Sequence, residues 1–252
     1  MLTLFSDLDH TLIYSHRVSL PGKKVLAERL NGKEQSYMSE YTFRYLQGER
    51  APRLIPVTTR SDEQFRRLLP LIRSFGCQYA LVCNGGLLLI DGKSDPDWLE
   101  ETLALAEQEL KALPEAAAWL RERCGGERTH TPQGLMAYAA CAEPERLAED
   151  LRRRVDPARL QVGYDGRKLY CIPKSINKGS AVRRFIERFS PDRPILAAGD
   201  SEFDLPMLEA ADRGFAPAAL AARAGRASIV GLDTETGVFS DQICDALREV
   251  GG

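Results

Sequence analysis

The sequence predicts a doubly wound α/β fold, in which helices cover both faces of a parallel sheet, with a small α+β unit inserted into it. Along most of the chain, short apolar runs alternate with amphipathic stretches, a pattern typical of parallel sheets. Residues 93–168 break this rhythm, with an order of helix, strand, helix and two strands. We therefore expect a core domain of residues 1–92 and 169–252 and an inserted domain of residues 93–168.

The first core segment contains three expected parallel strands. Leu2 to Ser6 and Arg53 to Val57 are short apolar runs that suit buried strands. Ser61 to Phe75 has the apolar period of a helix, with Ser61 as its N-cap. Tyr79 to Cys83 is the third strand, and Leu87 to Ile90 is expected to return beside it after an Asn-Gly-Gly turn.

A β-hairpin is expected between the first two parallel strands. The extended runs Val25 to Leu30 and Glu34 to Met38 flank the pair Asn31-Gly32. An Asn-Gly pair between two extended runs is a strong signal for a hairpin. We interpret this segment as a flap that either gates a pocket or forms an interface.

The inserted segment and the second core segment complete the pattern. A long helical region from Trp98 to Arg123, interrupted at Pro114, opens the insertion. Further elements are expected as follows: extended runs at 135–141, 160–164 and 168–172, helices at 145–155 and 180–189, a strand at 195–198, and weaker strands at 214–216 and 228–230.

The composition is that of an ordinary globular protein. Hydrophobic residues make up 44% of the 252 residues and charged residues 28%, which argues against disorder. A formal net charge of −2 gives no attraction for nucleic acid. The amino terminus lacks the features of a signal peptide, no apolar run approaches the ~18 residues of a membrane span, and the six cysteines show no metal or disulfide spacing. We expect a cytoplasmic protein with no membrane or nucleic-acid partner.

Two aspartates follow the first strand. In an open parallel sheet ligands bind beyond the carboxyl ends of the strands, so Asp7 and Asp9 are expected at the functional edge. Their carboxylates repel one another unless a cation lies between them, and several carboxylates together suit Mg²⁺. The alternative is a polar strand end whose aspartates cap the following turn.

Three other strand ends carry suitable groups at the same edge. Thr58, Thr59 and Arg60 close the second strand, where hydroxyls either bind a phosphate oxygen or simply cap the next helix. Lys178 opens a helix and is either an ammonium beside the site or a surface lysine. Asp200 and Asp204 follow a later strand. Helix capping does not account for all four strand ends together.

These motifs resemble those of the haloacid dehalogenase-like (HAD) superfamily, in its branch of phosphatases with a large cap of the C2 type. DLDHTL is similar to the first motif, PVTTR to the second, Lys178 to the third and GDSEFD to the fourth. The order is right and the match spans residues 7–204. The chain is similar to the Cof-type, sucrose-phosphate phosphatase and mannosyl-3-phosphoglycerate phosphatase groups. The resemblance implies a Rossmann-like core, with residues 93–168 as the cap.

The resemblance also implies a role for each matching residue. Asp7 is expected to be the nucleophile and Asp9 the general acid and base, while Thr58 and Lys178 bind the transferring phosphoryl group. The Mg²⁺ ligands are expected to be Asp7, the Asp9 carbonyl and Asp200, and Asp204 is expected to orient Lys178 or a metal-bound water. The expected substrate-binding residues are Thr58, Thr59, Arg60, Asn84 and Lys178, and Arg167, Lys168 and Lys174 are further candidates.

Two residues depart from the family pattern. Thr59 stands where many relatives that bear a cap have glycine, and Phe203 replaces a common asparagine. Both departures concern the surroundings of the phosphate and not the metal site.

The expected function is Mg²⁺-dependent hydrolysis of a small-molecule phosphomonoester, such as a phosphosugar, through an aspartyl-phosphate intermediate. Within the superfamily, an aspartate at position 9 favours phosphoester chemistry over dehalogenation. Two alternatives stay open, a sugar phosphomutase and a non-catalytic binding or regulatory module on this fold. The identity of the substrate and the oligomeric state do not follow from the sequence.

Overall fold

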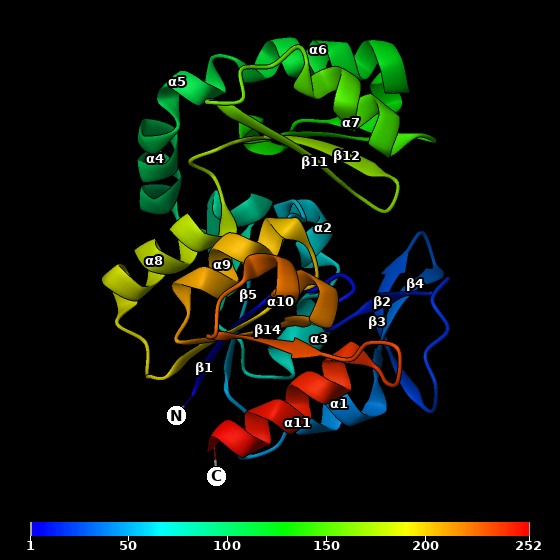
Figure 1. Cartoon of the computed structure of the whole chain (residues 1–252), viewed down its shortest axis with the longest axis vertical. Helices are drawn as coiled ribbons and strands as arrows, with labels where there is room; N and C mark the ends of the chain where they lie inside the picture. Colours follow the sequence, from blue (N-terminus) through cyan, green and yellow to red (C-terminus); the bar gives the residue numbers. More distant parts are fainter. Residues whose placement is uncertain (1, 252) are drawn as a thin grey trace. The chain divides into compact units, whose positions relative to one another are not determined.

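The computed structural model describes residues 2–251, and a parallel sheet of five strands forms the centre of its core (Figure 1). The strand order is β15–β14–β13–β1–β5, and every neighbouring pair is parallel. The strands are β1 (Thr3–Ser6), β5 (Arg53–Pro56), β13 (Ile195–Ala198), β14 (Arg213–Pro217) and β15 (Ile229–Leu232). All residues of β1 and β13 are buried, as expected for strands with both faces covered. The predicted α/β fold is confirmed.

The strand order reverses its direction between β1 and β13. From β1 the chain proceeds to β5 on one side, and it later fills the other side with β13, β14 and β15. In the register, Ser6 lies opposite Ala198, and the N–H of Asp7 donates to the carbonyl of Ala198 at 2.9 Å. Ligands of open α/β sheets bind at such a switch point, so the fold places the residues after β1 and β13 where a site is expected.

A hairpin extends the edge of the core sheet beyond β5. The strands β6 (Tyr79–Val82) and β7 (Leu87–Ile90) pair antiparallel, and the short strand β8 (Lys93–Ser94) follows β7 in the same sheet. A single parallel bridge joins Val57 to Leu81 and ties β6 to the end of β5. The predicted return of the chain at 87–90 is therefore confirmed.

One predicted core helix is divided in the structure, and the core helices at 40–46, 205–210, 218–224 and 239–251 were not predicted. The expected single helix at 61–75 is two helices, because Pro70 has no N–H to donate to the carbonyl of Arg66. Ser61 is the N-cap, in a capping box with Gln64. The core helices are α1 (Glu40–Leu46), α2 (Asp62–Arg66), α3 (Leu69–Arg73), α8 (Lys178–Phe189), α9 (Leu205–Ala210), α10 (Ala218–Ala224) and α11 (Phe239–Gly251).

The predicted flap is a small antiparallel sheet beside the core helix α1. Its strands are β2 (Tyr14–Ser15), β3 (Lys24–Leu30) and β4 (Lys33–Ser39), in the order β2–β4–β3. The turn residues Asn31 and Gly32 have φ values of 51° and 76°, the left-handed conformations that a tight hairpin turn requires. The register of β3 against β4 shifts on both sides of Glu28, so the hairpin contains a bulge there.

Residues 94–177 form a second compact unit with its own apolar core. Helices α6 and α7 pack on its four-stranded antiparallel sheet, whose order is β11–β12–β10–β9 (Figure 1). The strands are β9 (Thr129–His130), β10 (Ala137–Ala140), β11 (Leu160–Asp165) and β12 (Lys168–Pro173), and the helices are α4 (Pro96–Leu105), α5 (Glu107–Leu110), α6 (Leu113–Cys124) and α7 (Pro144–Arg152).

Two boundaries in this unit correct the sequence prediction. The predicted end of the inserted domain at residue 168 is too early, because β12 pairs along its whole length with β11 and so belongs to the inserted sheet. The helical region at 98–123 breaks at Ala106 and again before Leu113, so that Pro114 lies in the first turn of α6. Proline is tolerated there because the first N–H groups of a helix have no partner within it.

The helices among residues 2–251 are short, and none combines the length and apolar character needed to cross a membrane. The side chains of all six cysteines are free thiols, five of them buried. Burial raises the pKa of Cys83 and Cys244 to about 12. These cysteines are therefore poor thiolate nucleophiles, in agreement with the prediction of reduced core residues.

Candidate active site

Asp7 follows β1 directly, and the chain then makes a tight turn. The N–H groups of Leu12 and Ile13 both donate to the carbonyl of Leu8, at 2.9 and 2.8 Å. His10, at the exposed tip, has a φ of 61°. The turn keeps Asp7 and Asp9 at the carboxyl edge of the sheet, as the sequence predicted.

Lys178 lies between two buried carboxylates. Its Nζ is 2.7 Å from Oδ1 of Asp7 and also contacts Oδ1 of Asp204. Burial alone would lower the pKa of Lys178, but the carboxylates of Asp204 and Asp7 outweigh burial and raise this pKa above its ordinary value. Lys178 is therefore a charged, buried ammonium, and the interpretation as a surface lysine is wrong.

A close approach of two helices places Lys178 at this depth. A Cβ on Gly179 would lie 2.2 Å from the carbonyl oxygen of Pro206, at the start of α9. No side chain larger than hydrogen fits there without movement of the backbone. Gly179 thus lets the first turn of α8 contact α9, next to Asp204.

Asp204 is held by hydrogen bonds on both of its oxygens. Its Oδ1 contacts Lys178, and its Oδ2 accepts from the N–H groups of Asp200 and Ser201, at 3.1 and 2.9 Å, and from the Ser201 hydroxyl at 2.8 Å. A Cβ on Gly199 would lie 2.3 Å from Cβ of Asp204, so this tight turn needs glycine. These contacts fit the expected role of orienting Lys178.

Asp7, Asp200 and Asp204 form a group whose oxygens could hold a metal ion. One carboxylate oxygen of each lies within 4.8 Å of the others. Thr11 donates its hydroxyl to Oδ1 of Asp200 at 2.7 Å and so orients that carboxylate. We call Asp7, Lys178, Asp200 and Asp204 the carboxylate cluster.

The carboxylate cluster has the donor set and the charge that suit Mg²⁺. It contains three carboxylates, and its ammonium contacts two of them, those of Asp7 and Asp204. Burial raises the pKa of Asp7 well above its usual range; Lys178 opposes this effect, and Asp204 and Asp200 add to it. A cation beside Asp7 would favour its ionised form. Carboxylate oxygens are the ligands that Mg²⁺ prefers.

The loops after β5 and β6 are joined by backbone hydrogen bonds of Thr58. Thr58 is fully buried, its hydroxyl accepts from the N–H of Arg60 at 3.2 Å, and its carbonyl accepts from the N–H of Asn84 at 2.9 Å. The structure thus brings together Thr58 and Asn84, two of the expected substrate-binding residues. Thr59 is half-buried, and Phe203 is packed into the core.

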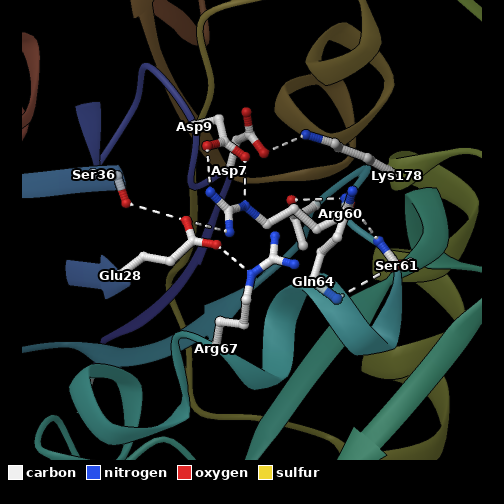
Figure 2. Close-up of polar contacts among 10 residues, drawn as sticks. Asp7, Asp9, Glu28, Ser36, Arg60, Ser61, Gln64, Arg67 and Lys178 are labelled. Atoms are coloured by element: carbon white, nitrogen blue, oxygen red, sulfur yellow. Dashed lines mark hydrogen bonds and ion pairs between the residues drawn. The ribbon is translucent and has the colours of Figure 1, made fainter. Parts of the chain in front are cut away.

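Arg60, an expected substrate-binding residue, is paired with carboxylates in this structure, and its contact with substrate stays a prediction. Its guanidinium donates to both oxygens of Asp9, from Nε and from Nη2, each at 2.7 Å, and its Nη1 donates to Glu28 at 3.0 Å (Figure 2). Each of its three nitrogens therefore already has a carboxylate partner. The carboxylates raise the pKa of Arg60 in spite of burial, which alone would lower it.

Glu28 and Arg67 complete this network, which we call the arginine clamp: Asp9, Glu28, Arg60 and Arg67. Nε of Arg67 donates to Oε1 of Glu28 at 2.6 Å (Figure 2). Glu28, Arg67 and Thr11 are not among the site residues predicted from the sequence. Thr11 lies within the DLDHTL motif and could have been considered. Nothing in the sequence around Glu28 distinguishes it from an exposed hairpin residue.

A pocket of about 510 Å³ opens beside Asp200. Its walls come from the turn after β1, with His10, and from the loops at 18–21 and 234–239. Tyr14 also lines it, and burial raises the pKa of this phenol to about 12, so it is neutral at physiological pH. The core by itself therefore offers space for a small ligand next to the carboxylate cluster.

The comparison with protein families identifies one match. Residues 61–219 match the haloacid dehalogenase-like hydrolase family. A phosphoglycolate phosphatase from Methanopyrus kandleri is 30% identical over 159 residues, which cover 61% of this chain and 65% of that protein's own length.

Solved structures with the same fold cover nearly the whole chain. The sucrose-phosphatase from Synechocystis sp. PCC6803, in complex with sucrose and phosphate, is 19% identical with a TM-score of 0.63, over 98% of this chain and 97% of that one. A sugar phosphatase of HAD subclass IIB is 15% identical with a TM-score of 0.63, over 100% and 99%. A putative HAD/COF-like hydrolase from Plasmodium vivax is 13% identical with a TM-score of 0.63, over 99% and 96%. At sequence identities of 13–19%, these similarities establish the fold alone.

Proposed function

The chain belongs to the haloacid dehalogenase-like hydrolase family, and from this premise we propose that it is a Mg²⁺-dependent phosphatase of small-molecule phosphomonoesters. The observation that carries the proposal is the carboxylate cluster, in which a buried ammonium contacts Asp7 at the switch point of the sheet. Asp9 lies two residues further on. This arrangement combines a nucleophile, an acid–base group and cationic stabilisation of a phosphoryl group.

In the proposed reaction Asp7 attacks phosphorus, and the bond from phosphorus to the ester oxygen breaks as the aspartyl-phosphate forms. Asp9 gives a proton to the departing oxygen and then takes one from the water that attacks the intermediate. That second attack releases inorganic phosphate and restores Asp7. Lys178 stabilises the negative charge of the transferring group, and the loop of Thr58 is proposed to bind its oxygens.

Asp7 and Asp200 are the proposed side-chain ligands of Mg²⁺, together with the Asp9 carbonyl. Bound there, the metal would screen the charge of the carboxylate nucleophile from that of the phosphate. Asp204 is proposed to orient Lys178, because protein donors engage both of its oxygens.

The proposed substrate class is a small phosphomonoester, such as a phosphosugar or a phosphorylated hydroxy acid. The named relatives support this class, since one is a phosphoglycolate phosphatase and another a sucrose-phosphatase. The pocket beside Asp200 is large enough for a small ligand. A role of Arg167, Lys168 and Lys174 in substrate binding stays a prediction.

The first test is release of phosphate from p-nitrophenyl phosphate and from a panel of phosphosugars and phosphorylated acids, with Mg²⁺ and with EDTA. We expect release that requires Mg²⁺ and that falls by at least about 10³-fold in Asp7→Asn. Asp245→Asn, an exposed carboxylate of α11, is the matched control and should keep full activity. Turnover that depends on an added sugar bisphosphate would indicate a phosphomutase. An inert protein that binds phosphometabolites would indicate a non-catalytic module.

A further inference from the structure

Glu28 is a buried carboxylate that no step of the proposed reaction uses. Its side chain is 4% exposed, and it accepts from Nη1 of Arg60 at 3.0 Å, Nε of Arg67 at 2.6 Å and the hydroxyl of Ser36 at 3.3 Å. Such a carboxylate is stable only because these donors surround it. It comes from the hairpin, an element separate from the strand ends that carry the rest of the site.

The bulge in the hairpin explains why Glu28 points inward. A regular strand alternates its side chains between two faces, whereas Ala27 and Glu28 are both buried. The register of β3 shifts on either side of Glu28, which pairs with Ser36. Bulges re-aim side chains in this way and are common beside active sites. Figure 2 shows Glu28 directed from β3 toward the guanidinium of Arg60.

Glu28 restricts how Arg60 meets Asp9. The guanidinium is planar and rigid, so a partner on Nη1 limits the rotation of the whole group. The opposite edge of the same group then presents Nε and Nη2 to the two oxygens of Asp9, each at 2.7 Å. The side chain of Asp9 is 35% exposed, so these two contacts restrict the rotation of a carboxylate that solvent also reaches.

We propose that Glu28 is a positioning residue for the acid–base function of Asp9, acting through Arg60. This inference rests on the proposed function. General acid–base catalysis requires the carboxylate to face the leaving oxygen or the attacking water, and small misplacements reduce the rate strongly. The hairpin therefore supplies the group that orients the catalytic acid and base, and Arg67 holds Glu28 from its other side.

The test compares two aryl esters that differ in the basicity of the leaving group. Loss of a well-placed general acid slows phenyl phosphate, whose leaving group needs a proton, more than p-nitrophenyl phosphate, whose leaving group does not. For Glu28→Gln we expect kcat/KM, which reports the step in which the leaving group departs, to fall about 30-fold on phenyl phosphate and about threefold on p-nitrophenyl phosphate. Glu28→Asp should recover part of the loss.

Glu34→Gln is the matched control. Glu34 is on the same hairpin and pairs with Arg29, but both side chains are exposed and neither belongs to the arginine clamp. Its kcat/KM should match that of the wild type on both esters. An equal fall of kcat/KM on both esters in Glu28→Gln, or an unchanged kcat/KM on both, would overturn the proposal, because a merely structural role does not depend on the leaving group.

A double-mutant cycle tests whether Glu28 acts through Arg60. In an Arg60→Met background, adding Glu28→Gln should change kcat/KM on phenyl phosphate by less than about twofold, since the connection is already broken. The same 30-fold loss in both backgrounds would contradict the proposal.

The proposed function and this inference fail in distinguishable ways. A wild type that hydrolyses neither ester nor any phosphometabolite refutes the function. Thermal unfolding then tests whether Glu28 is coupled to Asp9 through Arg60. Because both residues contact Arg60, the Tm shift of the double variant Asp9→Asn/Glu28→Gln should differ from the sum of the two single shifts by about 2–4 °C. Strictly additive Tm shifts would show that Glu28 and Asp9 are not coupled through Arg60.

Discussion

The carboxylate cluster and the arginine clamp begin two residues apart, at Asp7 and Asp9, yet they differ in their balance of charge. In the cluster three carboxylates face one ammonium, and in the clamp two carboxylates face two guanidinium groups. The proposed Mg²⁺ would offset the excess of carboxylates in the cluster, whereas the clamp pairs carboxylates with its own guanidinium groups. The two networks thus suit different roles: the cluster is suited to bind a cation, and the clamp is suited to hold the side chain of Asp9 in place.

The two networks also differ in origin. The cluster is made from strand ends of the core sheet, with each member close to β1, β13 or the start of α8. The clamp needs the hairpin, which supplies Glu28, and α2 with its following turn, which supplies Arg67. Removing single members of each network should therefore give different responses.

The largest effect on stability is expected for Lys178→Met. This change leaves Asp7 and Asp204 buried without their ammonium, and breaking a buried pair in this way typically destabilises by about 3–5 kcal/mol. The free energy of unfolding in urea measures it. Lys111→Met, which removes an exposed i,i+4 pair with Glu107, is the control and should change stability by less than about 0.5 kcal/mol. Equal effects of the two changes would show that the cluster is not a tightly coupled unit.

A smaller loss is expected for Arg60→Met. Glu28 would keep Arg67, and Asp9 is partly exposed and can be hydrated, so we expect a loss of about 2–3 kcal/mol in urea unfolding. Arg29→Met removes an exposed hairpin pair and serves as the control. A loss of unfolding free energy as large as that of Lys178→Met would show that the two networks contribute equally to stability.

Mg²⁺ should stabilise the protein through the cluster and not through the clamp. At 100 times its Kd, a ligand bound only to the folded state adds about 2.7 kcal/mol, and EDTA should reverse the resulting rise in Tm. Asp200→Asn should remove most of this response, whereas Glu28→Gln should keep it. A response lost equally in both variants would mean that the clamp also takes part in metal binding.

The smallest effect is expected for Glu34→Gln. Its partner Arg29 is exposed, and such surface pairs contribute about 0.2–1 kcal/mol. A change in urea unfolding below about 0.5 kcal/mol would show that burial, and not membership of the hairpin, gives Glu28 its importance. A loss above about 2 kcal/mol would mean that the hairpin depends on its surface charges.

Most elements of the core could be predicted from the sequence. Apolar runs predicted β1 and β13, the Asn-Gly pair predicted the hairpin turn, and Ser61 with Gln64 marked a helix start. The helices α1, α9, α10 and α11 were not predicted, and the other errors concern where elements end. Periodicity extends across Pro70, and it does not reveal that the strand at 168–173 belongs to the inserted sheet.

The sequence by itself determined the parallel sheet, the two-part organisation and the acidic residues at the strand ends, because these depend on local patterns and on rules of topology. Only the tertiary structure decided the partners of the charged groups. Arg60 looks like a ligand for phosphate in its motif, yet Asp9 and Glu28 engage it. Glu28 is 32 residues away from Arg60 and is turned inward by a bulge. Such pairings arise from contacts distant in the chain, which no local pattern records.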